Sequence, residues 1–303
     1  MKSGFIAILG KPNVGKSSLM NALVGEKVSI VSPKAQTTRD KILGIVTSDE
    51  YQMIFVDTPG VHRPRNRLGE YMEKCVSESE RDVDAIVIVL DATRGVSEAE
   101  LDFIEKHLKI KGACVYVVIN KTDLVSYDTV YPMLSKLAYL TNADKSRGAI
   151  KEIIPTSART GENVELLRRY LADELPEGQC YFPEDEYTDK SERFMVCEII
   201  REKALLFLQD EVPHGIGVVL QSMSAEKNLV NIEADMVCER KSHKAIIIGD
   251  GGSKLRKIGE SARLDIEKLL GKKVYLKLFV KVRDGWRNKK NVMTDIGYNP
   301  KNV

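Results

Sequence analysis

The feature that most restricts the fold of this chain is a glycine-rich segment near the N-terminus, which fits the pattern GxxxxGK[ST]. The segment reads Gly10-Lys11-Pro12-Asn13-Val14-Gly15-Lys16-Ser17. An apolar run precedes it and an amphipathic stretch follows it, so it stands between a predicted strand and a predicted helix. A turn of this kind directs its backbone N–H groups toward an anion. We therefore predict a phosphate-binding loop, to which we add the next residue, Ser18, and we disfavour an ordinary Gly-rich turn.

Three side chains are predicted to act on the phosphates and on Mg²⁺, the expected cofactor. Lys16 reaches the β- and γ-phosphates, and Ser17 offers its hydroxyl to the metal ion. A DTPG sequence at 57–60 follows another predicted strand, where Asp57 can hold Mg²⁺ through water. The backbone N–H of Gly60 can then meet the γ-phosphate, and we expect Lys16 and Gly60 to act in catalysis.

A loop with the sequence Gln-Thr-Thr-Arg at 36–39 lies between these two motifs. One of its two threonines is expected to complete the Mg²⁺ shell when a nucleoside triphosphate is bound. We favour Thr38 over Thr37 for this catalytic and metal-binding role. A pair of exposed threonines before a strand is the alternative.

The base is predicted from two further segments, each at the end of a predicted strand. Asn120-Lys121-Thr122-Asp123 provides a carboxylate at Asp123, which can accept from N1–H and from the exocyclic amine of guanine. Adenine does not offer this pair of donors, so the motif selects GTP and GDP. Ser157-Ala158, followed by Arg159, is the second segment, and its backbone N–H is expected to meet the guanine O6.

The first half of the chain alternates β-branched runs with amphipathic stretches, a βαβ pattern. The pattern predicts an α/β fold with a doubly wound, mainly parallel sheet, whose ligands bind at the carboxyl ends of the strands. The predicted strands are 5–9, 52–56, 85–90, 113–119 and 152–155, and the predicted helices are 17–23, 68–80, 98–108, 131–140 and 164–171.

The 303 residues predict two domains, because one modest core rarely holds so long a chain. We expect the nucleotide-binding domain at 1–173, an acidic, Pro-containing linker at 174–190, and a smaller α+β domain with a basic tail at 191–303. In that domain we predict helices at 193–208, 243–248 and 254–269, and strands at 217–223, 229–238 and 274–282.

Charge is distributed unequally between the two ends of the chain. Residues 239–303 contain 17 Lys and Arg against 7 Asp and Glu, whereas residues 1–238 contain 29 against 37. This asymmetry indicates a polyanionic partner for the C-terminal part, either a nucleic acid or an anionic membrane surface. A solvated basic surface explains the charge alone equally well.

The motifs together resemble those of the bacterial Era GTPases, relatives of the TrmE and Der proteins. The resemblance rests on Asn13 in the phosphate loop, on the TTR sequence at 37–39, and on Val61, which stands where many GTPases have a water-orienting glutamine. Segments at 191–194, 198–203, 211–213 and 247–254 resemble the C-terminal KH domain of that family. The resemblance covers essentially the whole chain and implies a KH fold of type II.

The resemblance also implies partners and an ion. Era-type proteins bind single-stranded sequence near the 3′ end of small-subunit (16S) ribosomal RNA and assist assembly of the small ribosomal subunit. In Era-like and TrmE-like proteins the residue at the position of Asn13 coordinates an activating K⁺, so Asn13 is a candidate catalytic residue. Because Val61 cannot orient water, intrinsic hydrolysis is expected to be slow.

The predicted RNA site is the loop Gly249-Asp250-Gly251-Gly252, which fits a GxxG pattern between two predicted helices. Its glycines let the backbone approach a sugar-phosphate chain closely. We add the residues that follow, Ser253, Lys254, Arg256 and Lys257. Asp250 departs from the basic residue common at this position, which weakens the expected contact with phosphate.

Two other functions stay open from the sequence. One is GTP-driven RNA modification, as in the TrmE proteins. The other is a Ras-like signalling module or a switch at the membrane surface, for which the basic tail would bind lipid. We expect a cytoplasmic monomer, with peripheral association at the inner face of the membrane as an implication of the family.

Overall fold

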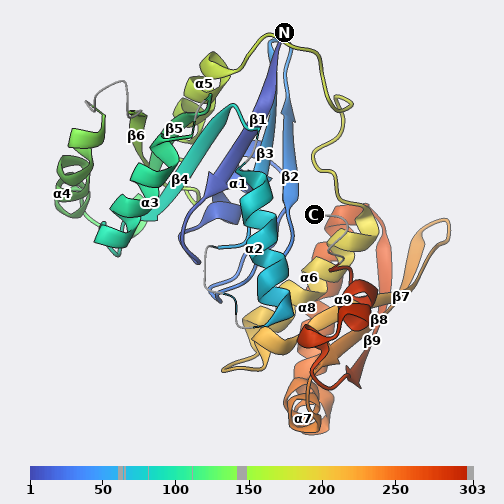
Figure 1. Cartoon of the computed structure of the whole chain (residues 1–303). Coiled ribbons are helices and arrows are strands. Elements are labelled where there is room, and N and C mark those ends of the chain that lie inside the picture. The colour runs from blue at the N-terminus through green and yellow to red at the C-terminus, as the bar shows by residue number, and fades with distance from the viewer. Residues whose placement is uncertain (61–63, 65, 81, 111, 142–148, 299–303) are drawn as a thin grey trace. The chain divides into compact units, whose positions relative to one another are not determined.

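The computed structural model describes the chain except for residues 61–63, 65, 81, 111, 142–148 and 299–303 (Figure 1). The described residues form two compact units. Unit 1 takes in 1–29, 38–62 and 75–189, and unit 2 takes in 30–37, 63–74 and 190–303, each as far as it is described. Two segments of the N-terminal half therefore belong to unit 2. The domain boundaries predicted from the sequence stay predictions.

A six-stranded sheet in the order β2-β3-β1-β4-β5-β6 forms the centre of unit 1. All neighbouring strands are parallel except β2, which is antiparallel to β3. This confirms the predicted doubly wound, mainly parallel fold. β4 is buried along its whole length, as expected of a β-branched run in a sheet covered on both faces. The strands are β1 (Lys2–Leu9), β2 (Ile42–Thr47), β3 (Tyr51–Asp57), β4 (Ala85–Asp91), β5 (Cys114–Asn120) and β6 (Ile150–Thr156).

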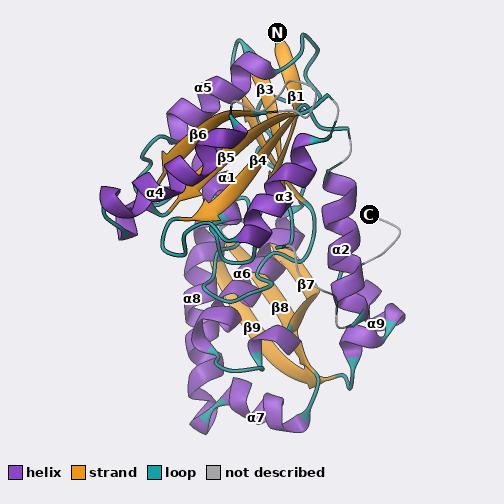
Figure 2. Cartoon of the chain, turned by 60° about the vertical axis from the view of Figure 1, so that its left-hand side comes forward, coloured by secondary structure: helices purple, strands orange, loops and turns teal. Residues whose placement is uncertain are grey.

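Helices cover both faces of this sheet (Figure 2). On one face, α3 and α4 pack on alternate residues of β1, β4 and β5. On the other face, α1 packs on β1 and β3 and contacts α5. A capping box between Ser97 and Glu100 begins α3. The helices of unit 1 are α1 (Lys16–Val24), α3 (Glu98–Leu108), α4 (Tyr127–Leu137) and α5 (Val164–Glu174), whereas α2 (Arg67–Ser79) is divided between the units, its residues up to Lys74 belonging to unit 2.

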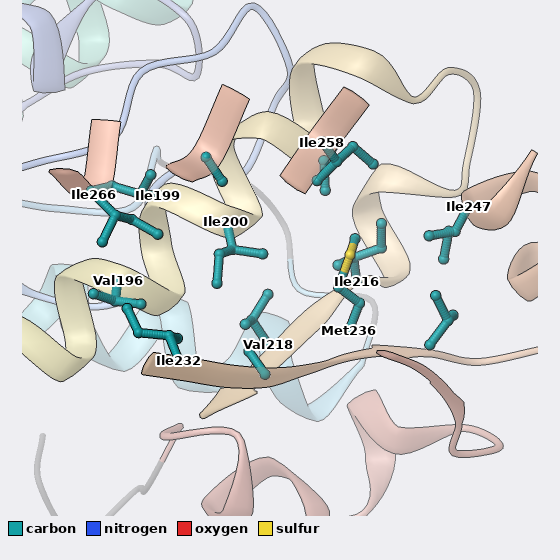
Figure 3. Packing of buried hydrophobic residues seen from close by; sticks show 14 of the residues in the cluster. Val196, Ile199, Ile200, Ile216, Val218, Ile232, Met236, Ile247, Ile258 and Ile266 are labelled. Carbon is teal, nitrogen blue, oxygen red and sulfur yellow. The ribbon is translucent and has the colours of Figure 1, made fainter. Parts of the chain in front are cut away.

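Unit 2 contains a three-stranded sheet in the order β7-β8-β9, in which β7 and β8 are antiparallel and β8 and β9 are parallel. Helices α6 and α8 pack on the sheet and on each other. Their apolar residues meet those of the strands in one core (Figure 3). The elements are α6 (Glu192–Phe207), β7 (Gly217–Ala225), β8 (Leu229–Cys238), α7 (Lys241–Ile248), α8 (Ser253–Leu270), β9 (Lys273–Val282) and α9 (Lys290–Asp295).

Short 3-10 turns at 122–124, 138–140, 213–215, 250–252 and 286–288 complete the described secondary structure. Within the described part of the chain, none of the helices combines the length and the apolar character that crossing a bilayer requires.

Candidate nucleotide and RNA sites

The predicted phosphate loop connects the end of β1 to the start of α1, and two of its glycines are required by its geometry. Gly10 has a φ of 146°, and a Cβ there would lie 2.5 Å from the carbonyl oxygen of Val89. Gly15 has a φ of 97°, and a Cβ there would lie 2.2 Å from Nδ2 of Asn120. The loop therefore keeps its shape only with glycine at both positions.

Lys16 lies buried beneath this loop. Its Nζ donates to the carbonyl oxygens of Gly10 and Lys11, each at 3.2 Å. Burial lowers the pKa of the Lys16 ammonium to about 8, while the charge of Asp57 acts in the opposite direction. A bound phosphate chain would add further negative charge beside this ammonium group.

The three predicted metal-binding side chains converge at the carboxyl end of β3. Oδ2 of Asp57 accepts from the hydroxyl of Ser17 at 2.6 Å and from that of Thr38 at 3.2 Å, and the two hydroxyl oxygens are 2.8 Å apart. Ser29, which sequence reasoning missed, also donates to this oxygen at 3.0 Å. No sequence pattern marks Ser29.

The other carboxylate oxygen of Asp57 makes this cluster suitable for a cation. Among the described residues, the buried Oδ1 has no hydrogen-bond partner. Burial raises the pKa of Asp57, although Lys16 and the three hydroxyl groups act to lower it. A fully buried carboxylate with an unsatisfied oxygen is costly, and a hard cation with oxygen ligands removes that cost.

The structure separates the two candidate threonines. Thr37 Oγ1 lies 2.7 Å from the hydroxyl of Ser32 and donates to the carbonyl oxygen of Lys34, also at 2.7 Å. Only Thr38 directs its hydroxyl to Ser17 and Asp57.

Gly60 lies against the phosphate loop. A Cβ at Gly60 would lie 2.8 Å from Cα of Pro12, so only glycine allows this approach. The backbone of Gly60 is therefore close to the predicted phosphate position. Val61, which stands in place of the glutamine, lies outside the described residues.

The predicted base-binding segments are joined to the phosphate loop by hydrogen bonds. Asn120 donates from Nδ2 to the carbonyl oxygen of Val14 at 3.0 Å, and its Oδ1 accepts from the Ala158 N–H at 3.1 Å. Lys121 donates to the carbonyl oxygen of Asn13 and pairs with Asp91, both at 2.6 Å. Asp91, at the end of β4, was not predicted as a site residue, although its position as a carboxylate at the end of a predicted strand could have indicated it.

Asp123 is held by the second base-binding segment. Its Oδ1 accepts from Ser157 Oγ at 2.6 Å, and its Oδ2 pairs with Arg159 at 2.5 Å. The side chain of Asp123 is 11% exposed, whereas that of Arg159 is 70% exposed. The structure therefore brings together the predicted residues of the nucleotide site from both halves of unit 1.

The predicted RNA loop connects α7 to α8 in unit 2. Its three glycines, Gly249, Gly251 and Gly252, have φ values of 71°, 56° and 80°. These left-handed conformations favour glycine. Space is open around Gly251 and Gly252, because a Cβ at either position would meet no atom within 4 Å. Asp250 is exposed.

A groove of about 330 Å³ begins at this loop and runs between α8 and β9. Arg256 and Gly252 are the predicted residues that line it, whereas Lys257 lies over the ring of Phe207 at 4.7 Å. Sequence reasoning missed the apolar lining, although i, i+4 spacing on α8 and alternation on β9 could have indicated it. The lining residues are Gly252, Leu255, Arg256, Gly259, Glu260, Arg263, Leu276 and Leu278.

Trp286 is fully buried within unit 2, although arginines at 283 and 287 on either side of it made stacking on a base an alternative to packing. Its Nε1 donates to the carbonyl oxygen of Gly215 at 2.8 Å, and its ring stacks on Tyr298.

Comparison with known proteins finds relatives for both parts of the chain. Residues 5–121 match the family described as 50S ribosome-binding GTPase, and residues 211–287 match the KH domain. A GTPase Era of Clostridium botulinum strain Hall is 46% identical over 298 residues, which cover 98% of each chain. A second, from strain Alaska E43, is 46% identical and covers 99% of each chain.

Two solved structures are also similar over nearly the whole chain. Era in complex with MgGDPNP and nucleotides 1506–1542 of 16S ribosomal RNA is 38% identical with a TM-score of 0.91, and the match covers 99% of each chain. A point variant of Aquifex aeolicus Era bound to GDP.AlF4⁻ has the same identity and TM-score, over 99% of this chain and all of the other. With this similarity along its length, the chain belongs to the Era family of GTPases.

Proposed function

We propose that this chain binds GTP and GDP with Mg²⁺, hydrolyses GTP, and binds RNA near the 3′ end of small-subunit ribosomal RNA during assembly of that subunit. The observation that carries the proposal is the convergence of Ser17, Thr38 and the half-satisfied carboxylate of Asp57 beside the phosphate loop. Similar proteins have been solved with MgGDPNP and with GDP.AlF4⁻.

Each residue of the site has one proposed task. The backbone N–H groups of Gly10–Ser18 and the ammonium of Lys16 bind the phosphates. Ser17, Thr38 and Asp57 hold Mg²⁺, which when bound neutralises charge on the β- and γ-phosphates. The N–H of Gly60 binds the γ-phosphate, and Asp123 accepts from guanine. Asn120, Lys121, Ser157 and Arg159 hold the base-binding segments in place, and the Ala158 N–H meets O6.

Hydrolysis is proposed to depend on an additional cation, because Val61 cannot orient water. The amide oxygen of Asn13 is a chemically suitable ligand for K⁺. The loop is held at this residue, because the carbonyl oxygen of Asn13 accepts from Lys121. K⁺ at Asn13 would add positive charge where negative charge develops during hydrolysis.

RNA binding is assigned to the groove between α8 and β9. Three leucines form apolar walls for unstacked bases, Arg256 and Arg263 contribute positive charge, and the glycine loop allows close approach of the backbone. Ser253, Lys254 and Lys257 extend the positive surface beyond the groove. The RNA itself is inferred from the relative solved with nucleotides 1506–1542 of 16S ribosomal RNA.

Two experiments test the proposal. Hydrolysis of GTP is measured with and without Mg²⁺ for wild type and for Asp57→Asn. We expect turnover by wild type to depend on Mg²⁺ and Asp57→Asn to lose this turnover. RNA crosslinked to the chain in cells is then sequenced, and the 3′ end of small-subunit ribosomal RNA is expected. Crosslinks only to other RNA would contradict the proposed RNA partner, and binding to anionic liposomes without RNA binding would favour the membrane alternative. A peripheral membrane location and the monomeric state stay predictions.

A further inference from the structure

Helix α6 of unit 2 buries four charged side chains, which is uncommon for a single helix. Glu198, Arg201, Glu202 and Lys203 are each at most 8% exposed. Such side chains are almost never buried unless they are paired, and a buried ion pair is often no more stabilising than apolar residues of the same size. Stability alone therefore does not explain these four residues.

Two of the four hold the ends of the loop at 30–37, which belongs to the same unit. Glu202 Oε1 accepts from the backbone N–H of Val31 at 2.9 Å. Arg201 Nη2 donates to the carbonyl oxygen of Thr37 at 2.5 Å. Adjacent residues of one helix thus bind the first and the last part of this loop.

The other two charged residues fix the side chains that bind the loop. Glu198 accepts from Nε of Arg201 at 2.7 Å and also from Nη2, which gives a two-pronged ion pair. Lys203 pairs with Glu202 at 2.9 Å and with Asp265 of α8 at 2.5 Å. The ion pairs within α6 and with α8 therefore hold the side chains of Arg201 and Glu202 in one geometry without a contribution from the loop.

The carbonyl group that Arg201 binds belongs to the peptide bond between Thr37 and Thr38. Holding this oxygen restrains the peptide plane, which also contains the Cα atom of Thr38. Thr38 then directs its hydroxyl to Ser17 and Asp57. The hydroxyl of Thr37 is engaged within the loop by Ser32, so it does not compete for that position.

We propose that Arg201 and Glu202 are positioning residues for GTP hydrolysis, which hold the 30–37 loop so that Thr38 stays at the Mg²⁺ site. The inference deepens the proposed function and rests on it. Because both residues act through Thr38, their loss should affect the Mg²⁺-dependent reaction of GTP. Recognition of guanine by Asp123 and binding of GDP should be unchanged.

The test uses the full chain with two disruptive variants and two matched controls. Arg201→Met and Glu202→Met remove the groups that bind the loop. Glu202→Gln keeps an amide oxygen that can accept from Val31, and Arg287→Met removes a different arginine of unit 2, one paired with Glu239 at 2.5 Å. For each protein, kcat, KM, the Mg²⁺ concentration for half-maximal rate and the affinity for GDP are measured.

Loss of one charge-assisted hydrogen bond is expected to lower kcat about tenfold in both disruptive variants. These variants should also require more Mg²⁺, with GDP affinity unchanged. Glu202→Gln and Arg287→Met should keep the wild-type kcat.

Wild-type kcat and Mg²⁺ dependence in both disruptive variants would overturn the proposal. An equal loss in Glu202→Gln and Glu202→Met would also overturn it, because the charge and not the acceptor would then matter. If circular dichroism shows that Arg201→Met is unfolded, the two Glu202 variants decide. Absence of GTP hydrolysis by wild type would instead refute the proposed function.

Discussion

Replacing Asp123 with Asn should exchange the base specificity of the nucleotide site. The carboxylate is proposed to accept two hydrogen bonds from guanine, and each bond to a charged group contributes about 1.5 to 3 kcal/mol. Loss of both therefore costs about 3 to 6 kcal/mol, or about a 10² to 10⁴-fold rise in the Kd for GTP. Xanthosine triphosphate offers the complementary pattern and should bind the variant more tightly than wild type.

The structure indicates that the folded protein tolerates this change. The side-chain oxygen of Asn can still accept from Ser157, as Oδ1 of Asp123 does at 2.6 Å. The ion pair with Arg159 is lost, but Arg159 is 70% exposed, and pairs with exposed partners contribute at most about 1 kcal/mol. The loss of nucleotide affinity should therefore greatly exceed the loss of stability.

The assay is a fluorescence titration of wild type, Asp123→Asn and Thr122→Ala with guanine and xanthine nucleotides, accompanied by thermal melting. Thr122 lies in the same motif, and its hydroxyl donates to Glu162 at 2.8 Å. The Thr122 variant should keep GTP affinity. Unchanged GTP affinity in Asp123→Asn would refute the assignment of this carboxylate to guanine.

Three further predictions concern the cation, the RNA groove and pH. K⁺ should raise turnover over Na⁺ in wild type but not in Asn13→Ala, and equal steady-state rates in the two salts would contradict a K⁺ site. Replacing both Gly251 and Gly252 with Asp should sharply weaken RNA binding, measured in a salt series, without changing GTP affinity. The change strains the left-handed backbone and adds negative charge beside the RNA phosphates. Normal RNA binding by this variant would mean that the glycines only turn the chain. The pKa of Lys16 falls from 10.5 to about 8 on folding, so between pH 8 and 10.5 this lysine binds a proton in the unfolded chain but not in the folded protein. The free energy of unfolding of the nucleotide-free protein should therefore rise with pH in this range. Lys16→Met should lack this rise in thermal melts, and an identical rise in both proteins would refute the shift.

The nucleotide site could be predicted almost completely because each part of it is local in sequence. The phosphate loop, the DTPG segment and the two base-binding segments each follow a strand, and parallel strands bring their carboxyl ends to the same edge of the sheet. Strand β2 was not among the predicted strands, because Gly44 interrupts its short β-branched run. A Cβ at Gly44 would lie 2.9 Å from Val24 of α1, so glycine at this position allows the helix to pack closely on the strand. The same glycine weakens the sequence pattern by which a strand is predicted.

The role of α6 could not be predicted, because its buried charges depend on partners far away in the sequence. Glu198, Arg201, Glu202 and Lys203 by themselves resemble the polar face of a surface helix, where i, i+3 ion pairs are common. In the structure, Glu202 and Arg201 bind Val31 and Thr37, more than 160 positions earlier. Sequence spacing within the helix contains no information about those contacts.

The buried charges of α6 would keep partners if the 30–37 loop were released. When the loop leaves, Arg201 keeps Glu198 and Glu202 keeps Lys203, so release leaves none of these four charges without a partner. Release costs the two hydrogen bonds to the loop, about 1.5 to 3 kcal/mol each, and any exposure of Ile30, which is fully buried, adds to this cost. A ligand that shifts a two-state equilibrium from 1:99 to 99:1 must bind one state about 5.5 kcal/mol more tightly than the other, which is comparable to the sum of the two hydrogen bonds. A nucleotide that binds Thr38 through Mg²⁺ only in the triphosphate state supplies a differential interaction of this kind. Because the ion pairs of Arg201 with Glu198 and of Lys203 with Glu202 and Asp265 lie within unit 2, breaking the two loop bonds would leave the charge pairing of α6 and α8 intact.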